Sequence, residues 1–386
     1  MPQTKNIFFL FSLMLLVSCI KPYDPKIDSN AESKYVVSGR ITDTEGWQEV
    51  EVSLSSPIES PAYIPVEGCQ VKIIDDNGHD FTLLEFEPGY YRVWMEQEYL
   101  ATGTAYQVRV TTPGGEELVS GFDTMPRGPQ MDSVYYFIEE KSTSNPNVYT
   151  TGMQFYIDLN AEAEHDYSRF YKWEVVETWE YTAAHPIEYY YDGSTHEVNP
   201  PDCTNYVCWI TTLYKNVFTI STKNLSQNSY RQYPLQFIDG STSRLSILYS
   251  ILVRQLALTE GAYNYWEQLR INSNEQGGLY EKQPLSIKGN IVNESNPEKD
   301  VLGYFYATSE SHKRYFYHNV EGVYLDFNNF CSESPLGRFG WREFFKYEYP
   351  VYFYYNEVGA LRTFNNECVD CRLLGGKTEK PDFWPY

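Results

Sequence analysis

The sequence predicts an all-β protein, mainly antiparallel, with one amphipathic helix. Aromatic side chains make up 17% of the 386 residues, with 36 Tyr, 21 Phe and 8 Trp, and such side chains favour the half-buried surface of a sheet. Apolar and polar residues alternate in short runs, and turn-forming residues separate these runs. This alternation is typical of β-sandwiches and barrels.

The composition excludes several classes of protein. The chain has 30 basic and 52 acidic side chains and a net charge of -22. We therefore expect no nucleic-acid partner, because phosphate binding needs a basic surface. An apolar content of 42% is too high for a disordered chain. The length suggests two or three domains.

Residues 1–18 predict a lipoprotein signal peptide. Lys5 precedes an apolar run that is short for a membrane-spanning helix. The run ends in Leu16-Val17-Ser18-Cys19, which resembles the bacterial lipobox. The alternative is an ordinary signal peptide, but an Ala-x-Ala-like cleavage site is absent. We therefore expect Cys19 to carry acyl chains that hold the protein on a bilayer, with residues 19–34 as an extended tether.

Residues 35–126 predict a β-sandwich domain. Asp76-Asn77-Gly78 lies between two alternating runs and is a strong hairpin signal, because Asn and Gly tolerate the positive φ of a type I′ turn. A calcium loop is the alternative for this acidic string, but the loop's terminal Glu is missing. Pro113-Gly114-Gly115 predicts a second hairpin.

The prolines of Met125-Pro126-Arg127-Gly128-Pro129 predict a domain boundary. Residues 130–386 beyond it predict a larger β-rich domain, because the alternating runs are longer and more aromatic there. One segment, 259–272, has a helical period, and Thr259 is placed to cap that helix. The apolar stripe of the helix would cover a sheet face or a barrel end.

Catalytic motifs are absent from the sequence. The six His residues form no His-Glu-x-x-His motif, and the chain has neither a Gly-x-Ser-x-Gly elbow nor a phosphate-binding loop. We assign no catalytic residue, no metal ligand and no cofactor. A carboxylate pair for hydrolysis cannot be chosen among 52 acidic side chains, because the spacing that matters is spatial.

Cysteine usage predicts disulfides, because an exported chain meets an oxidising compartment. The candidates are Cys203, Cys208, Cys331, Cys368 and Cys371, with Cys368 and Cys371 bonded to each other or to one of the other three. A redox-active Cys368-Val369-Asp370-Cys371 motif and a four-cysteine zinc site with Cys203 and Cys208 are the alternatives. We expect Cys69 to be a small buried side chain.

Tyrosine clusters supply the candidate binding residues. Such clusters place aromatic rings on both faces of a strand. One interpretation is cross-strand pairs that stabilise a sheet. The other is a platform for a sugar, a peptide or a partner protein. The candidates are Tyr189, Tyr190, Tyr191, Tyr352, Tyr354 and Tyr355.

Several motifs together resemble a lipoprotein family of the Bacteroidota, domain-of-unknown-function family 4249. Besides the lipobox they are KPYDP at 21–25, YVVSGRITD at 35–43, PVEGCQVKI at 65–73, PGYYRV at 88–93, YSILVRQ at 249–255, AYNYW at 262–266, VLGYF at 301–305, CVDC at 368–371 and KPDFW at 380–384. The resemblance implies a transthyretin-like or Ig-like N-terminal sandwich and an outer-membrane location. It also implies that the gene for this protein lies beside a gene for a TonB-dependent transporter. It brings no catalytic residues, and the Cys at position 69 differs from the Ala often found there.

Two functions follow as expectations. The first is a non-enzymatic, lipid-anchored protein that captures a ligand for a TonB-dependent transporter or assembles with it. The second is a surface hydrolase of glycans or peptides. A deep cleft lined by carboxylates with raised pKa values would favour the hydrolase, and a broad exposed aromatic patch would favour the binding protein.

Overall fold

The computed structural model describes residues 33–57, 60–143, 145, 147–274, 287–325, 331–337 and 340–385. The signal peptide predicted over 1–18, the lipidation site predicted at Cys19 and most of the tether predicted over 19–34 lie outside these residues. Within the described part of the chain, no helix is both long and apolar enough to cross a membrane.

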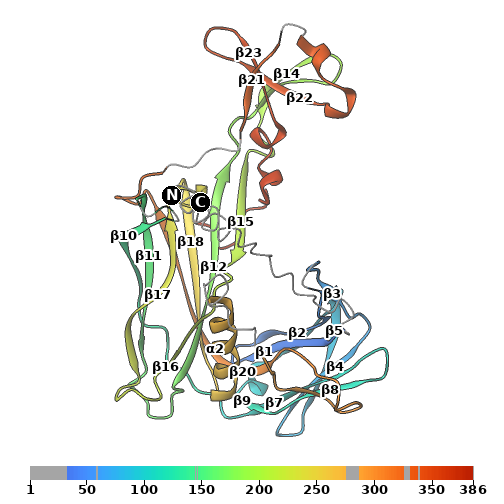
Figure 1. The fold of residues 1–386 in the computed structure, drawn as a ribbon, viewed down its shortest axis with the longest axis vertical. Coiled ribbons are helices and arrows are strands. Elements are labelled where there is room, and N and C mark those ends of the chain that lie inside the picture. Colours follow the sequence, from blue (N-terminus) through green and yellow to red (C-terminus); the bar gives the residue numbers. More distant parts are fainter. Residues whose placement is uncertain are drawn as a thin grey trace, which may run out of the picture.

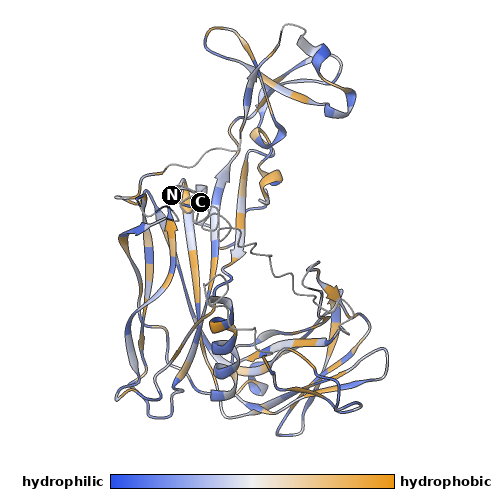
Figure 2. Cartoon of the chain, in the orientation of Figure 1, coloured by the Kyte–Doolittle hydropathy of each residue, from blue (hydrophilic) through white to orange (hydrophobic). Residues whose placement is uncertain are grey.

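The described chain is all-β, as predicted, with mostly antiparallel sheets and one α-helix, α2 (Glu260–Asn274). Figure 1 shows three parts: a first lobe in blue and teal, a second lobe of long strands beside it, and a small sheet at the far end of the second lobe. We call this small sheet the distal sheet. Apolar and polar residues alternate along many of the strands (Figure 2), so each sheet has one face suited to a core.

The first lobe is sandwich-like. Its core lies between two groups of strands and includes Val37, Val50, Ile73 and Val108, all of which are buried. The alternation in β4, buried at every second residue, is that of a strand with one face in a core. The strands are β1 (Tyr35–Thr42), β2 (Gly46–Leu54), β3 (Ile64–Pro65), β4 (Gln70–Asp75), β5 (Asp80–Glu87), β6 (Tyr90–Met95), β7 (Ala105–Thr111), β8 (Glu117–Ser120) and β9 (Asp123–Thr124).

The hairpin predicted at Asp76-Asn77-Gly78 joins β4 to β5. Gly78 has a φ of 90°, in the left-handed region that favours glycine. The Asp75 carboxylate accepts hydrogen bonds from the backbone amides of Asn77 at 3.0 Å and His79 at 2.8 Å. This carboxylate therefore stabilises the turn. Its hydrogen bonds support the hairpin rather than the alternative calcium loop.

The second lobe packs a three-stranded sheet against a larger one. The core between them holds Phe155, Trp173, Tyr249 and Ile251, all fully buried. One sheet contains β10 (Val134–Ser142), β11 (Tyr149–Asn160) and β17 (Ser229–Asp239); the other contains β12 (Phe170–Thr182), β15 (Val207–Leu213), β16 (Phe218–Ser221), β18 (Leu248–Ala257) and β20 (Phe305–His318).

The helix predicted over 259–272 is α2, and Thr259 caps it as expected. The Thr259 hydroxyl accepts from the amide of Ala262 at 3.3 Å, and its carbonyl accepts from the amide of Tyr263 at 2.9 Å. The same hydroxyl donates to Asp123 at 2.7 Å, and Asp123 also accepts from the amide of Ala307 at 2.9 Å. Asp123 thus ties the start of the helix to β20.

Strand β20 belongs to both lobes. Its first residues pair in parallel with β1, where Gly39 lies opposite Phe305, and the rest pairs with β18. Strand β19 (Ile291–Asn293) pairs with β8. The chain therefore returns to the first lobe well after the boundary expected between 126 and 130.

The distal sheet stands beyond the ends of β12 and β15 (Figure 1). Two disulfides stabilise this region. Cys208–Cys371 joins β15 to the C-terminal segment, and Cys331–Cys368 joins the residues before β21 to those after β23. Its strands, in spatial order, are β14 (Thr195–Asp202), β13 (Ile187–Tyr191), β22 (Val351–Tyr355), β23 (Leu361–Phe364) and β21 (Glu333–Pro335).

Candidate functional site

The distal sheet brings the six predicted tyrosines together. Tyr189, Tyr190 and Tyr191 lie on β13, and Tyr352, Tyr354 and Tyr355 lie on β22, its antiparallel neighbour. Tyr190 is directly opposite Tyr352, so these two share one face with Tyr354, and the other three share the opposite face.

Most of these rings are covered by other side chains. Tyr191 stacks on Trp341 with centroids 4.5 Å apart, and Tyr354 stacks on His185 at 4.9 Å. Among the six, only Tyr355 is in the exposed class, with 48% of its surface accessible. The arrangement fits cross-strand stabilisation of the sheet, and a binding role for these tyrosines stays a prediction.

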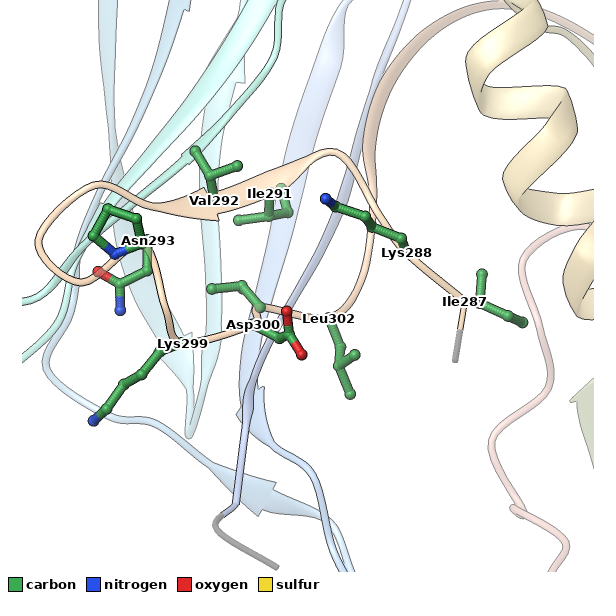
Figure 3. A pocket seen from close by; sticks show the side chains of 10 residues that line it. Ile287, Lys288, Ile291, Val292, Asn293, Lys299, Asp300 and Leu302 are labelled. Carbon is green, nitrogen blue, oxygen red and sulfur yellow. The ribbon is translucent and has the colours of Figure 1, made fainter. Parts of the chain in front are cut away.

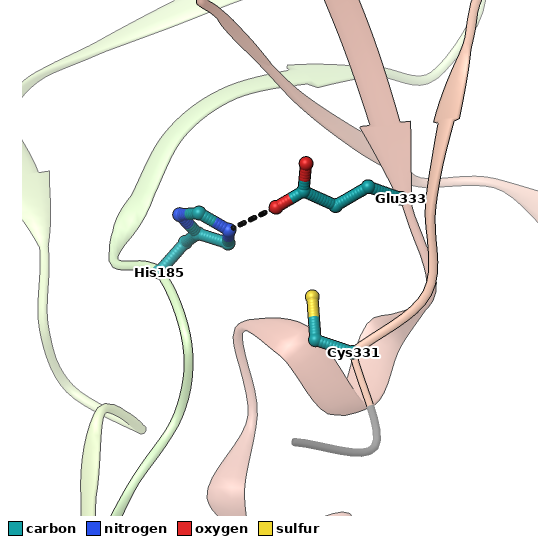
Figure 4. A group of neighbouring side chains, drawn as sticks. All are labelled: His185, Cys331 and Glu333. Atoms are coloured by element: carbon teal, nitrogen blue, oxygen red, sulfur yellow. Dashed lines mark hydrogen bonds and ion pairs between the residues drawn. The ribbon is translucent and has the colours of Figure 1, made fainter. Parts of the chain in front are cut away.

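His185, Cys331 and Glu333 meet at the edge of the distal sheet (Figure 4). His185 Nε2 lies 3.1 Å from Glu333 Oε1, and the Tyr354 hydroxyl donates to Glu333 Oε2 at 2.8 Å. Hydrogen bonds from Tyr354 and His185 lower the pKa of Glu333, although burial opposes the shift. Cys331 is bonded to Cys368 and offers no thiolate. In its oxidised form this group therefore joins β21 to its neighbours rather than providing three metal ligands.

The cysteines occupy three kinds of environment. Cys368 and Cys371 are each bonded to a distant cysteine and not to each other. Cys203 is a free exposed thiol, and Cys69 is a free thiol buried in the core of the first lobe. Of the four cysteines in the alternative zinc site, Cys208, Cys368 and Cys371 are in disulfides and only Cys203 keeps a free thiol.

A cavity of about 270 Å³ lies along residues 287–302 (Figure 3). Asp300, one of its lining residues, forms an ion pair with Lys34 at 2.7 Å, and Lys299 lies 3.4 Å from Glu116. None of the described residues that line it has an aromatic side chain. These residues therefore offer a ligand polar groups but no flat aromatic surface.

A larger cavity, of about 460 Å³, lies where the two lobes meet. We call it the cleft. Helix α2 stands beside it, at the corner between the lobes (Figure 1). The residues that line the cleft come from seven strands, from α2 and from the position before β20. They are Ser38, Gly39, Arg40, Glu49, Glu51, Tyr90, Lys172, Glu174, Leu213, Arg254, Tyr265, Trp266, Tyr304 and Tyr306.

Charges of alternating sign lie along the sheet that forms the floor of the cleft. Glu174 on β12, Arg254 on β18, Glu310 on β20 and Arg40 on β1 come from four consecutive strands of one sheet. Arg40 Nη1 donates to both oxygens of Glu174 at 2.8 Å, and Lys172 Nζ donates to Glu174 at 2.9 Å. Arg254 lies 3.7 Å from Glu310. The ion pairs hold these side chains in fixed positions.

Glu174 is ionised despite its burial, with 14% of its side chain exposed. Burial opposes the charge, but Lys172 and Arg40 outweigh it and lower the pKa of Glu174 to about 2. Glu51 behaves in the opposite way, because burial raises the pKa of its carboxyl group. Glu174 is therefore a permanent hydrogen-bond acceptor at neutral pH.

Aromatic side chains form the wall of the cleft. Tyr265 and Trp266 lie on α2, and the ring of Tyr265 is 4.9 Å from that of Tyr304. Lys172 Nζ lies 3.4 Å from the centre of the Trp266 ring, which is the geometry of a cation–π contact. Within the described residues, the buried indole N–H of Trp266 has no hydrogen-bond partner. The wall thus presents ring faces to the cleft, while the Trp266 N–H is buried behind them.

None of the cleft residues was selected as a binding residue from the sequence. Arg40, Tyr90, Arg254, Tyr265 and Tyr304 nevertheless fall in five of the motifs that carry the family resemblance. Those motifs lie far apart in the sequence, so only the fold shows that they surround one cavity.

The profile of a protein family described as "Domain of unknown function (DUF4249)" matches residues 20–314. The chain belongs to this family. The matched range of this DUF4249 protein includes every residue that lines the cleft. It ends before β21, β22 and β23 of the distal sheet. A search of curated proteins finds no match to this chain.

The cleft of this DUF4249 protein has the chemistry of a binding site. Its guanidinium and ammonium groups donate hydrogen bonds, its ionised carboxylates accept them, and its aromatic rings offer flat apolar surfaces. Because the charged groups are already paired with one another, they can hold a polar ligand without a large rearrangement.

Proposed function

We propose that this protein is a non-enzymatic lipoprotein of the outer membrane that captures a ligand for a TonB-dependent transporter. The observation that supports ligand capture is the cleft, where an aromatic wall faces a floor of fixed and paired charges. Convergent polar groups beside apolar surface are typical of small-molecule sites. The two lobes share strand β20, which keeps the wall and the floor together.

Lipid anchoring supports the membrane location in this proposal. Acyl chains on Cys19 would hold the chain on the bilayer. A tether of residues 19–34 spans at most about 55 Å when fully extended, so the body stays close to proteins in the same membrane. The net charge of -22 keeps the body away from anionic lipid.

The transporter partner rests on the resemblance to lipoproteins encoded beside TonB-dependent transporters. Exposed aromatic side chains near the distal sheet supply contact material for such a partner: Phe345 is 63% exposed, Tyr347 82% and Tyr355 48%. Tyrosine is enriched at protein interfaces because it combines a large ring with a hydrogen-bonding tip.

The test is cross-linking in intact cells, followed by purification of the native lipoprotein and identification of the proteins that come with it. We expect a TonB-dependent transporter in the wild-type sample and its loss with Cys19→Ala, which also removes palmitate labelling. Recovery of only lipid and peptidoglycan neighbours, with unchanged transporter uptake after gene deletion, would contradict the proposal.

A surface hydrolase is the second candidate, and one observation favours it. The cleft contains a carboxyl group with a raised pKa, Glu51, together with the ionised Glu174. Carboxyl groups with pKa values pushed apart are a feature of acid–base catalysis. Turnover of a glycan or a peptide by the wild-type protein, lost in Glu51→Gln, would support the hydrolase over the binding protein.

A further inference from the structure

An exposed aromatic surface continues outward from the cleft along the first lobe. Trp47 on β2 and Trp94 on β6 are direct cross-strand partners, with ring centroids 5.5 Å apart, and they are 51% and 48% exposed. The guanidinium of Arg92 lies 4.3 Å from the centre of the Trp47 ring and 4.2 Å from that of Phe86. We call Trp47, Trp94, Arg92 and Phe86 the platform.

The platform and the cleft share one sheet surface. Glu49 lies opposite Arg40 on one side and opposite Arg92 on the other, so it links a cleft residue to a platform residue. The alternation of charge thus extends over six adjacent strands, in the order Glu174, Arg254, Glu310, Arg40, Glu49 and Arg92. From β12 to β5 the path crosses six strand spacings, roughly 29 Å along the sheet.

The charges on this path are balanced. Four cations, Arg40, Arg92, Lys172 and Arg254, accompany four carboxylates, Glu49, Glu51, Glu174 and Glu310. The whole chain, in contrast, has a net charge of -22. A balanced surface gives neither an anion nor a cation a net advantage, whereas a hydroxyl group can accept from the cations and donate to the carboxylates. The charge pattern therefore suits a neutral ligand rich in hydroxyl groups.

The backbone of the floor is already paired. Strand β1 lies between β20 and β2, β2 lies between β1 and β6, and β6 lies between β2 and β5. A peptide that binds as an added strand needs a free sheet edge, and these strands offer side chains only. The floor thus disfavours an extended peptide.

We propose that the cleft and the platform form one continuous groove for a neutral oligosaccharide. The C–H groups on a sugar face pack against the exposed rings of Trp47 and Trp94. The hydroxyl groups bind the alternating Arg and Glu side chains. This inference deepens the proposed ligand capture by naming the class of ligand, and it rests on the cleft being the capture site.

The test measures binding of neutral oligosaccharides to the full-length lipoprotein in detergent. The probes are gluco-, xylo-, manno- and N-acetylglucosamine oligomers of two to six sugars, followed by tryptophan fluorescence and calorimetry. We expect at least one series to bind with a Kd that falls about tenfold or more from the dimer to the hexamer, because longer chains reach the platform as well as the cleft.

Three variants locate the ligand. Trp94→Ala should abolish the gain in affinity with chain length while leaving dimer binding unchanged. Glu49→Gln should weaken the longer oligomers by about fivefold, because it removes a charged acceptor at the junction. Tyr347→Ala removes an aromatic ring that is 82% exposed but lies outside the groove, and it should change nothing.

Three outcomes would overturn this inference. They are no binding by any series below about 1 mM, a length dependence that survives in Trp94→Ala, and tighter binding of unstructured peptides than of oligosaccharides. If any of these outcomes is found but a transporter still purifies together with the Trp94→Ala variant, the inference fails and the proposed association with a transporter stands. Oligosaccharide binding without any transporter partner would instead support the groove and contradict the proposed partner.

Discussion

Glu174 illustrates how one buried residue depends on its neighbours for its charge. Arg40 and Lys172 donate three hydrogen bonds to its two oxygens. Removing one partner of such a group leaves the other charge buried without compensation, which costs more than the ion pair contributes. Glu174 therefore affects the stability of the fold, and in the proposed capture site it would also affect the affinity for a ligand.

The first prediction concerns the pH dependence of stability. The folded-state pKa of Glu174, about 2, lies below its ordinary value of 4.5. Its contribution is fully present above pH 4.5 and is lost as the pH falls toward 2, and it amounts to roughly 3 kcal/mol. Urea unfolding of Glu174→Gln should show lower stability than wild type at pH 7 and a smaller loss between pH 5 and pH 2.5.

Glu51→Gln is the matched control for that measurement. Burial raises the pKa of Glu51, so ionising it on going from acid to neutral pH lowers the stability of the folded protein. The Gln variant should therefore gain stability relative to wild type as the pH rises. Parallel pH profiles for wild type and Glu174→Gln would contradict the role assigned to Glu174.

At the scale of elements, the junction between β1 and β20 depends on a glycine. Gly303 has a φ of +95°, and a Cβ there would lie 2.0 Å from the carbonyl oxygen of Val37. The close approach lets the amide of Val37 reach the carbonyl of Leu302 at 2.9 Å. A side chain at 303 is incompatible with this contact.

The second prediction uses a pair of glycines to isolate that contact. Gly303→Ala should lower the free energy of unfolding by about 3 kcal/mol or more, because backbone strain and a clash combine. Gly115→Ala shares a positive φ, +80°, but has open space around the new Cβ, and it should cost about 1 kcal/mol. Equal losses in denaturant melts would show that the contact with Val37 is unimportant.

The third prediction concerns the disulfide that fastens the C-terminal segment. Cys208–Cys371 joins residues 163 positions apart, and the backbones of Trp209 and Lys377 also exchange hydrogen bonds at 2.9 and 3.0 Å. The double variant Cys208→Ala/Cys371→Ala should lose about 3 kcal/mol and become sensitive to proteolysis after residue 371. Cys203→Ala, which removes the exposed free thiol, should match wild type in both measurements, and protease resistance of the double variant would refute the prediction.

At the scale of the molecule, local patterns predicted the elements but not the cleft. The β class, the helix at 259–272 and the Asn77-Gly78 turn follow from periodicity and turn chemistry, which act between near neighbours. The cleft needs Gly39 to pair with Phe305, 266 positions later, and no local pattern specifies that partner. The tyrosine clusters could be identified from the sequence, because their members are consecutive. The stacking of Trp341 and His185 on two of these tyrosines could not be predicted in this way.

The fourth prediction follows from the shared strand. The core of the first lobe includes Ile291, Val301, Phe305 and Ala307 in addition to residues before 126. A fragment of residues 33–127 should therefore expose apolar surface and bind ANS, with poor chemical-shift dispersion. Joining residues 287–312 to it through a flexible linker should restore dispersion and remove ANS binding. A well-folded 33–127 fragment would mean that β19 and β20 are dispensable.

The return of the chain to β1 also sets an order of events during synthesis of the protein. Strand β1 is synthesised before the other described strands, but its neighbour β20 follows only after more than 260 further residues. Until then one edge of β1 has no partner, and an unpaired edge invites pairing with other chains. During synthesis the polypeptide therefore passes through a half-closed form in which one edge of β1 is open.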